Sequence, residues 1–250
     1  MEMTTILGLL IGIGGILIGN IIEGGHLGSL VQGAAAIIVF SGTLGAVILS
    51  SKKRDLKLGL KMGREVFGEV DESRQRIILD EILESAKIAR KESILAIEAK
   101  ISGMSDPFLK NVIQSVVDGV DPQIIRSIYE KQIDLEEEKL NAGAKIWMDA
   151  GGFAPTVGII GAVLGLIHVM GNLSDTSKLG AGIAVAFVAT IYGVASSNLI
   201  FIPIANKLKK RVQDEIRIKE MILEGGLAIL SGLTPSLIDI KLKSFLESEN

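Results

Sequence analysis

Charge is confined to two stretches of this 250-residue chain, and this confinement limits its possible folds more than any other feature. Of the 26 basic and 29 acidic residues, all but five lie within residues 50–148 and 206–250. The exceptions are Glu2, Glu23, Asp149, Asp175 and Lys178. A soluble globule carries charge along every surface helix, and a disordered chain lacks the apolar content found here, where 48% of residues are hydrophobic. The pattern predicts an integral membrane protein.

Four uncharged segments are each long enough to cross a bilayer. They are residues 4–22, 27–51, 150–174 and 179–206. A bilayer core of roughly 30 Å requires about 20 helical residues, and membrane helices tolerate Gly, Ser and Thr. A β-barrel would show short alternating strands instead. The predicted fold is an all-α integral membrane protein with four transmembrane helices.

Basic residues beside the spans predict their orientation. They are Lys52, Lys53, Arg54 and Lys57 after the second span, Lys145 before the third, and Lys207, Lys209, Lys210 and Arg211 after the fourth. By the positive-inside rule, these regions and both termini are cytoplasmic. The predicted organisation is a transmembrane hairpin over 1–51, a cytoplasmic domain over 52–148, a second hairpin over 149–206 and a cytoplasmic tail over 207–250.

The large segment between the second and third spans is predicted to be helical, as is the tail. Apolar residues recur at near-helical spacing in one run over 71–101. Asp106-Pro107 and Asp121-Pro122 are each typical of an N-cap followed by proline in the first helical turn.

Several function classes find no support in the sequence. The chain has no Cys, which excludes disulfides, thiolate nucleophiles and zinc sites built on sulfur. A net charge of -3 and the lack of an aromatic and basic stripe argue against nucleic-acid binding. No catalytic motif or paired catalytic carboxylate is visible, so we predict no enzymatic activity, cofactor or metal site.

The four spans contain no Asp, Glu, Lys or Arg. Ion pathways need an ionisable or coordinating group at membrane depth, so another chain would have to supply the carboxylate. This chain offers hydroxyl and amide groups at Thr156, Thr190, Ser196, Ser197 and Asn198. Their commoner role is hydrogen bonding to a neighbouring turn or helix.

Glycines and prolines within the spans suggest close packing and bending. Small-residue spacing occurs at Gly8, Gly12, Gly15 and Gly19 in the first span and at Gly158, Gly161 and Gly165 in the third. This spacing is equally consistent with packing inside the chain and between chains. Pro155 and Pro203 each remove a backbone hydrogen bond, and act as hinges or simply begin or end a span.

Opposite charges recur on the predicted helix over 71–101. On one continuous helix, Arg90 and Glu98 lie about 80° apart around the axis, and Lys91 nearly eclipses Glu98. One exposed surface therefore presents both signs. A solvated face is the commoner meaning of such a pattern.

Four segments carry a family resemblance: EGGHLGSLVQ at 23–32, IARKESILAIE at 88–98, APTVGIIGAVLGLIH at 154–168 and FVATIYGVASSNLIFIPIANKLK at 187–209. Together they resemble the MotA/PomA subunits of the bacterial flagellar stator. The resemblance covers essentially the whole chain. The four-span layout with a large loop also matches MotA rather than the more distant, three-span ExbB and TolQ channel subunits.

The resemblance implies a bacterial inner-membrane complex that converts ion flow into torque on the flagellar rotor. It implies a homopentamer around a B subunit, whose single transmembrane helix carries the ion-binding Asp and which also has a peptidoglycan-binding domain. Thr190 would line the ion path beside that Asp, and we place Thr156 on the same path. Sodium-type relatives often have Thr where this chain has Ala162, which favours protons, with sodium as the alternative.

The resemblance also implies mechanical roles. Pro155 and Pro203 would couple ion occupancy to helix movement. Arg90 and Glu98 match a charged pair that engages the rotor's switch complex, and Lys91 is a further candidate for this contact. The family's usual Gly between them is replaced here, with Ser93 or a neighbour in its place.

Two other functions fit parts of the sequence. One is an ExbB/TolQ-like proton-channel subunit that energises outer-membrane processes. The other is a passive membrane scaffold, whose small residues only pack. The four spans, the EGG turn at 23–25 and the charged-loop motif argue against the first. Partner-dependent ion flux would exclude the second.

Overall fold

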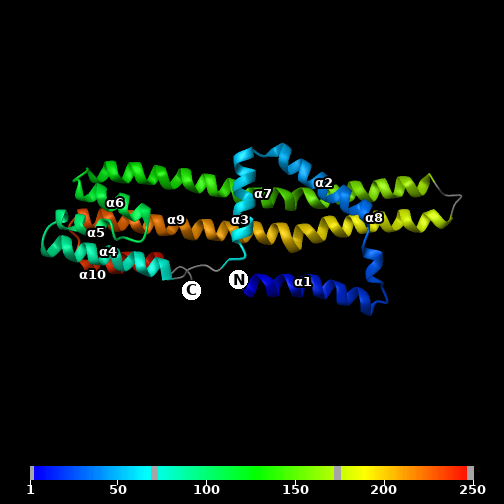
Figure 1. The fold of residues 1–250 in the computed structure, drawn as a ribbon, viewed down its shortest axis with the longest axis horizontal. Helices are drawn as coiled ribbons and strands as arrows, with labels where there is room; N and C mark the ends of the chain where they lie inside the picture. The colour runs from blue at the N-terminus through cyan, green and yellow to red at the C-terminus, as the bar shows by residue number, and fades with distance from the viewer. Residues whose placement is uncertain (1–2, 69–72, 172–175, 247–250) are drawn as a thin grey trace. The chain divides into compact units, whose positions relative to one another are not determined.

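The structure of the chain is a computed structural model that describes residues 3–68, 73–171 and 176–246 (Figure 1). Throughout these residues the regular secondary structure is helical. Four of the described helices are long and apolar enough to cross a membrane: Met3–Ile22, Leu27–Ser50, Pro122–Met170 and Leu179–Leu230. The predicted all-α fold with four transmembrane helices is therefore confirmed.

The chain forms two compact units. Unit 1 comprises Met1–Glu69 and Leu140–Lys210, and unit 2 comprises Val70–Lys139 and Arg211–Asn250. Helices α7 (Pro122–Met170) and α9 (Ile202–Leu230) contribute residues to both. The sequence-derived boundaries at 51, 148 and 206 mark where a charged stretch begins or ends. The two units are instead defined by their compactness, so the sequence-derived boundaries stay predictions.

Unit 1 contains the apolar helices. Its other elements are α1 (Met3–Ile22), η1 (Leu27–Leu30), α2 (Gly33–Ser50), α3 (Lys53–Glu65), α8 (Thr176–Ser196) and the π-helix η3 (Ser197–Phe201). Helix α1 ends at Ile22, and Gly24 in the turn that follows has a φ of +87°, the left-handed conformation that favours glycine. The third predicted span extends to 174, but α7 ends at Met170 and residues 172–174 lie outside the described residues.

Helices α7 and α8 approach each other at their backbones. A Cβ atom at Gly158 would lie 2.9 Å from the carbonyl oxygen of Ala189, and one at Gly193 would lie 2.5 Å from that of Ala154. Glycine removes these clashes, so two helices can pack closely where side-chain burial gains nothing over lipid. The third-span glycines therefore pack inside the chain. In α1, by contrast, a Cβ at Gly15 would meet no atom within 4 Å.

Unit 2 has an aliphatic core. It is formed by α4 (Ser73–Lys91), η2 (Ile94–Ile97), α5 (Glu98–Ile101), α6 (Pro107–Val117), α10 (Pro235–Leu246) and the adjoining parts of α7 and α9. Its fully buried side chains include Ile78, Ile82, Ile97, Leu109, Ile113, Ile125, Met221, Ile222, Ile238 and Leu242. Burying such side chains is worth about 1.5–3 kcal/mol each.

Both predicted caps are confirmed. The Asp106 carboxylate accepts hydrogen bonds from the amides of Phe108 at 2.7 Å and Leu109 at 3.1 Å. Asp121 accepts in the same way from the amides of Gln123 and Ile124. Each carboxylate satisfies amides that the first helical turn leaves without a partner.

The single helix predicted over 71–101 is wrong. Helix α4 ends at Lys91, Ser93 is fully extended, and the chain resumes as η2 and then α5. The break allows Ile97 to be completely buried in the core. The angles between Arg90, Lys91 and Glu98 derived for one continuous helix therefore do not apply.

Candidate functional site

Pro155 interrupts the backbone hydrogen bonds of α7, and a neighbouring element repairs the interruption. Proline has no N–H, so the carbonyl of Gly151, four residues earlier, loses its helical donor. The Ser197 hydroxyl donates to this carbonyl oxygen at 2.6 Å. Ser197 is 1% exposed, so the bond is shielded from water. The gap in the α7 ladder is thus closed from η3.

Pro203 lies just after a second irregularity. The π-helix η3 separates α8 from α9, and Pro203 is the second residue of α9. A proline ring clashes with the carbonyl four residues earlier, here that of Leu199, and a widened turn relieves such a clash. The fourth span is therefore not one regular α-helix. Because Ser197 begins η3, its bond to Gly151 joins the two proline-containing segments.

The predicted ion-path residues lie on α7 and α8. Thr190 is half-buried and donates to the Ala186 carbonyl at 3.3 Å. Thr156 is exposed and donates to the Phe153 carbonyl at 2.8 Å. Both hydroxyls thus bond within their own helix, and among the described residues no hydrogen bond joins the two. Ala162 is half-buried on α7. Their place on an ion path stays a prediction.

Thr190 nevertheless lies in the close contact between the two helices. A Cβ at Gly158 would lie 3.5 Å from the Thr190 Cα. Any movement of α8 along α7 would therefore change the surroundings of Thr190. The hinge role of Pro155 and Pro203 stays a prediction, now with a defined contact beside it.

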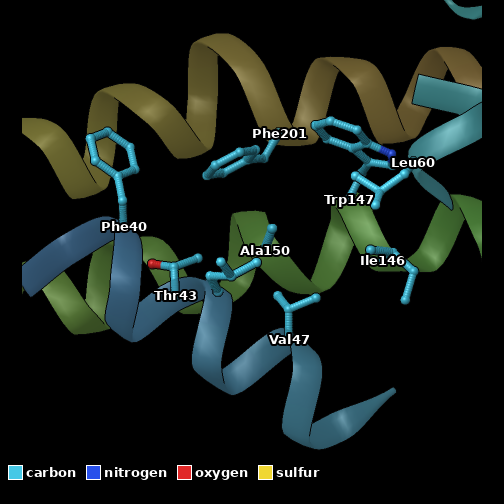
Figure 2. Close-up of a pocket in the computed structure, with 9 residues that line it drawn as sticks. Phe40, Thr43, Val47, Leu60, Ile146, Trp147, Ala150 and Phe201 are labelled. Carbon is cyan, nitrogen blue, oxygen red and sulfur yellow. The ribbon is translucent and has the colours of Figure 1, made fainter. Parts of the chain in front are cut away.

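An apolar cavity of about 260 Å³ lies in unit 1 between α2, α3, α7 and η3 (Figure 2). On its wall, the Trp147 indole donates to the Gly59 carbonyl at 2.8 Å and its ring lies 6.2 Å from that of Phe201. The Thr43 side chain is 4% exposed, and its hydroxyl has no hydrogen-bond partner among the described residues. The lining suits an apolar group and does not suit an ion. Sequence reasoning missed this cavity.

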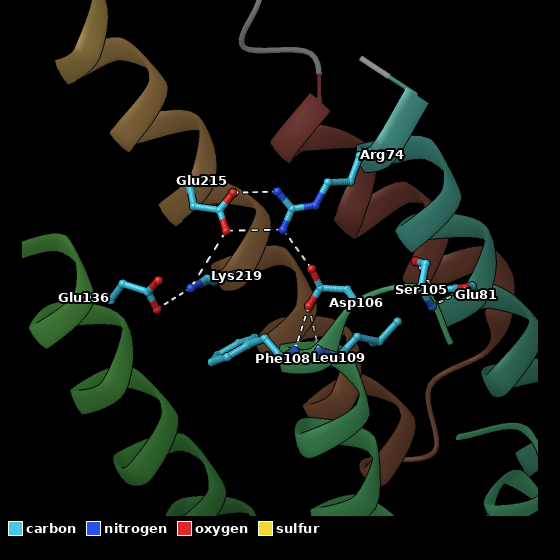
Figure 3. Close-up of polar contacts among 9 residues, drawn as sticks. All are labelled: Arg74, Glu81, Ser105, Asp106, Phe108, Leu109, Glu136, Glu215 and Lys219. Carbon is cyan, nitrogen blue, oxygen red and sulfur yellow. Dashed lines mark hydrogen bonds and ion pairs between the residues drawn. The ribbon is translucent and has the colours of Figure 1, made fainter. Parts of the chain in front are cut away.

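In unit 2, ion pairs connect separate helices (Figure 3). Arg74 on α4 pairs with Glu215 on α9 at 2.6 Å and with Asp106, before α6, at 2.8 Å. Lys219 on α9 pairs with Glu136 on α7 and lies 5.5 Å from the ring centre of Phe108. No local sequence signal pairs Arg74 with a residue 141 positions away.

The electrostatics of this cluster favour the charged forms of Asp106 and Arg74. Burial alone would raise the pKa of Asp106, but hydrogen bonds from Arg74 and from the Leu109 and Phe108 amides outweigh it and lower the pKa. The pKa of Arg74 is raised, chiefly by its hydrogen bond to Glu215. The cluster ties α4, α6, α7 and α9 together, which is a structural role.

The three predicted rotor-contact residues are exposed in unit 2. Arg90 and Lys91 lie in the last turn of α4, and Glu98 begins α5. Arg90 also lines a small cavity of about 140 Å³ with Ile94 and Leu233. All three side chains are accessible to a partner, as the hypothesis requires. Contact with the rotor stays a prediction.

Comparison with known proteins gives consistent matches. The signature of the MotA/TolQ/ExbB proton channel family matches residues 100–221. Motility protein A of Bacillus subtilis (strain 168) is 33% identical over 250 residues, covering 100% of this chain and 93% of that protein. Chemotaxis protein PomA of Vibrio alginolyticus is 32% identical, covering 98% of this chain and 96% of that protein.

Solved structures agree with these matches. The C. jejuni MotAB structure contains a chain with a TM-score of 0.92 and 30% identity, covering 100% of this chain and 98% of that chain. A chain of the flagellar MotAB stator complex from Bacillus subtilis gives a TM-score of 0.89 at 33% identity, covering 98% of this chain and 96% of that chain. The similarity therefore extends over nearly the full length of this chain and of each matched chain.

Proposed function

The chain belongs to the motility protein A family, and we propose that, as the A subunit of a flagellar stator, it forms an ion channel with a B subunit and converts ion flow into torque. The full-length match to chains of two MotAB structures carries this proposal. As a membrane-embedded subunit, it sits in the bacterial inner membrane. Basic residues after the second and fourth spans support cytoplasmic termini.

The lack of charge in the four spans supports a division of labour between subunits. Without a carboxylate at membrane depth, this chain needs a partner that provides one. The B subunit's membrane helix supplies an Asp, and its peptidoglycan-binding domain anchors the complex. A homopentamer of this chain surrounds it, and the rotor's switch complex is the second partner.

Protonation of the partner Asp drives the motion in this proposal. It removes a charge from the interface, so α7 and α8 can move past the B subunit about Pro155 and Pro203. The membrane potential supplies about 2.3 kcal/mol per charge per 100 mV, enough to bias each step. Ala162, an apolar residue, favours protons over sodium as the translocated ion.

Rotation of tethered cells tests the function directly. We expect a strain that lacks this gene to have intact filaments that do not turn, and the restored gene to recover rotation. Partner-dependent proton flux that disappears when the B-subunit Asp is replaced excludes a passive scaffold. Normal rotation without the gene in a strain that has no second stator set would overturn the proposal.

Thr190 tests the ion path. Thr190→Val, which keeps the shape but removes the hydroxyl, should reduce proton flux and swimming torque, whereas Thr190→Ser should retain most of both. Equal flux in the two variants would show that the hydroxyl has no part in conduction.

Charge reversal tests the rotor contact. Arg90→Glu and Glu98→Lys should each reduce torque, and a compensating reversal on the rotor should restore part of it. Lys131→Glu, an exposed reversal on α7 in the same unit, is the control. Surface pairs contribute about 0–1 kcal/mol each, so the single reversals should weaken torque without abolishing it. A coupling energy of zero would argue against direct contact.

A further inference from the structure

A cavity of about 610 Å³ in unit 1 has apolar walls and a basic rim. Helix α1 contributes Thr4, Thr5, Gly8 and Leu9, and α9 contributes Lys207 and Lys210. Cavities of roughly 300–1,000 Å³ hold ligands of drug size. The space is thus large enough for a molecular headgroup and the adjoining part of an apolar chain.

The basic rim is built from two elements. Lys207 and Lys210 are three residues apart, so they lie on one face of α9. The Lys207 ammonium donates to the Thr5 hydroxyl, which places a second hydrogen-bonding group beside it. Of the described residues that line the cavity, none is Asp or Glu. This rim therefore suits an anion with several oxygen acceptors.

The cavity straddles the end of an uncharged segment. Leu9, Leu199 and Ile204 on its walls belong to uncharged segments, whereas Lys207 is the first charged residue after the fourth span. A ligand that fills it is anionic at the rim and apolar at the wall. Phospholipids have this distribution, surround every membrane protein, and bind in basic pockets between transmembrane helices.

We propose that this cavity binds an anionic glycerophospholipid of the surrounding leaflet, with its phosphate on Lys207, Lys210 and Thr5 and an acyl chain along Leu9 and Ile204. The inference requires only that the chain spans a membrane, so it stands independently of torque generation. Because α1, η3 and α9 all line the cavity, the lipid would hold α1 against the segment that contains Pro203.

Lipid-dependent stability of the purified full-length protein tests the site. Its melting temperature is measured in mixed micelles with phosphatidylglycerol or with phosphatidylcholine of the same acyl chains, and the bound lipid is counted by native mass spectrometry. The wild type should retain phosphatidylglycerol and melt at a higher temperature with it than with phosphatidylcholine. Equal effects of the two lipids would overturn the proposal.

A matched pair of double variants separates the site from general attraction. Lys207→Gln with Lys210→Gln should weaken phosphatidylglycerol binding about thirtyfold, from about 1 kcal/mol per lysine. Lys57→Gln with Lys209→Gln removes the same charge from exposed positions that do not line the cavity, and should leave binding within about twofold. Equal loss in both pairs means unspecific attraction, and overturns the proposal.

A variant that leaves the charge unchanged tests the apolar part of the cavity. Gly8 lines the cavity and a Cβ there would meet no atom within 4 Å, so Gly8→Leu adds apolar volume at the cavity wall without a backbone clash at its Cβ. It should lower lipid retention while both lysines remain. The cavity variants are Gly8→Leu and the Lys207→Gln, Lys210→Gln pair. If they keep the wild-type selectivity for phosphatidylglycerol but change the number of subunits in the purified oligomer, a second copy of the chain covers the cavity and the proposal fails.

Discussion

Helix α7 is held in two different ways along its length. In unit 1 it meets α8 at the backbone, where Gly158 and Gly193 remove the side chains that would keep the helices apart. In unit 2 it buries Ile125 in the core and pairs Arg126 with Glu224 at 2.7 Å. Apolar side chains gain nothing by leaving lipid for a helix interface, but they gain about 25 cal/mol per Å² by leaving water. The solvent of each unit thus decides which residues stabilise it.

A second contrast lies within unit 1. A Cβ atom at Gly158, Gly161 or Gly165 of α7 would run into α8, whereas one at Gly8, Gly15 or Gly19 of α1 would meet no atom within 4 Å. The same spacing therefore has a different outcome in the two helices. In the homopentamer that we propose, the glycines of α1 face other chains or lipid.

The largest effect should come from filling the contact between α7 and α8. Gly193→Ala places a Cβ atom 2.5 Å from the Ala154 carbonyl oxygen, which cannot move without the α7 backbone. We expect a loss of about 3 kcal/mol in the free energy of unfolding, measured by denaturation in detergent micelles. Gly15→Ala is the control and should leave this free energy nearly unchanged. Wild-type stability of Gly193→Ala would contradict the packing described here.

The next effect should come from the buried cap of unit 2. Asp106→Ala removes both the cap of α6 and the partner of Arg74, and should cost about 2 kcal/mol. The comparison is Asp121→Ala, which removes an exposed cap and should cost about 1 kcal/mol or less. Equal losses would mean that the bond to Arg74 adds nothing to stability.

A smaller effect should come from the bond that closes the gap at Pro155. Ser197→Ala leaves the Gly151 carbonyl without its donor, at a cost of about 1–2 kcal/mol. In a Pro155→Ala background the helix regains an N–H for this carbonyl, so the same change should cost less. A double-mutant cycle between positions 155 and 197 measures the difference. Strict additivity would show that Ser197 does not replace the missing bond.

The smallest expected effect is the change in the pH dependence of stability that comes from the Asp106 carboxylate. Its pKa is lowered on folding, so its contribution to stability is complete above about 3.9, the pKa of an unfolded Asp. The contribution is lost as the pH falls through the folded-state pKa. Asp106→Asn should therefore flatten the acid limb of a plot of stability against pH. An unchanged acid limb would contradict the lowered pKa.

Local patterns predicted much of the fold. Uncharged length predicted the four spans, and the Asp-Pro pairs predicted the caps at Asp106 and Asp121. The break after Lys91 was missed because burial of Ile97 in the core overrides local helical spacing. The resemblance supplied the candidate residues, but the donor that Pro155 requires could not be inferred from it.

The sequence by itself determined which segments are apolar, where α6 and α7 begin and which carbonyl each proline deprives of a donor, because these properties depend on residues only a few positions apart. Tertiary structure decided that Ser197 bonds to Gly151 and that Arg74 pairs with Glu215. It also decided that Gly158 of α7 lies against α8 while Gly15 of α1 has open space beside it. These contacts join residues distant in the sequence. They form only when packing brings the residues together, and similar spacings in α1 and α7 can therefore have different outcomes.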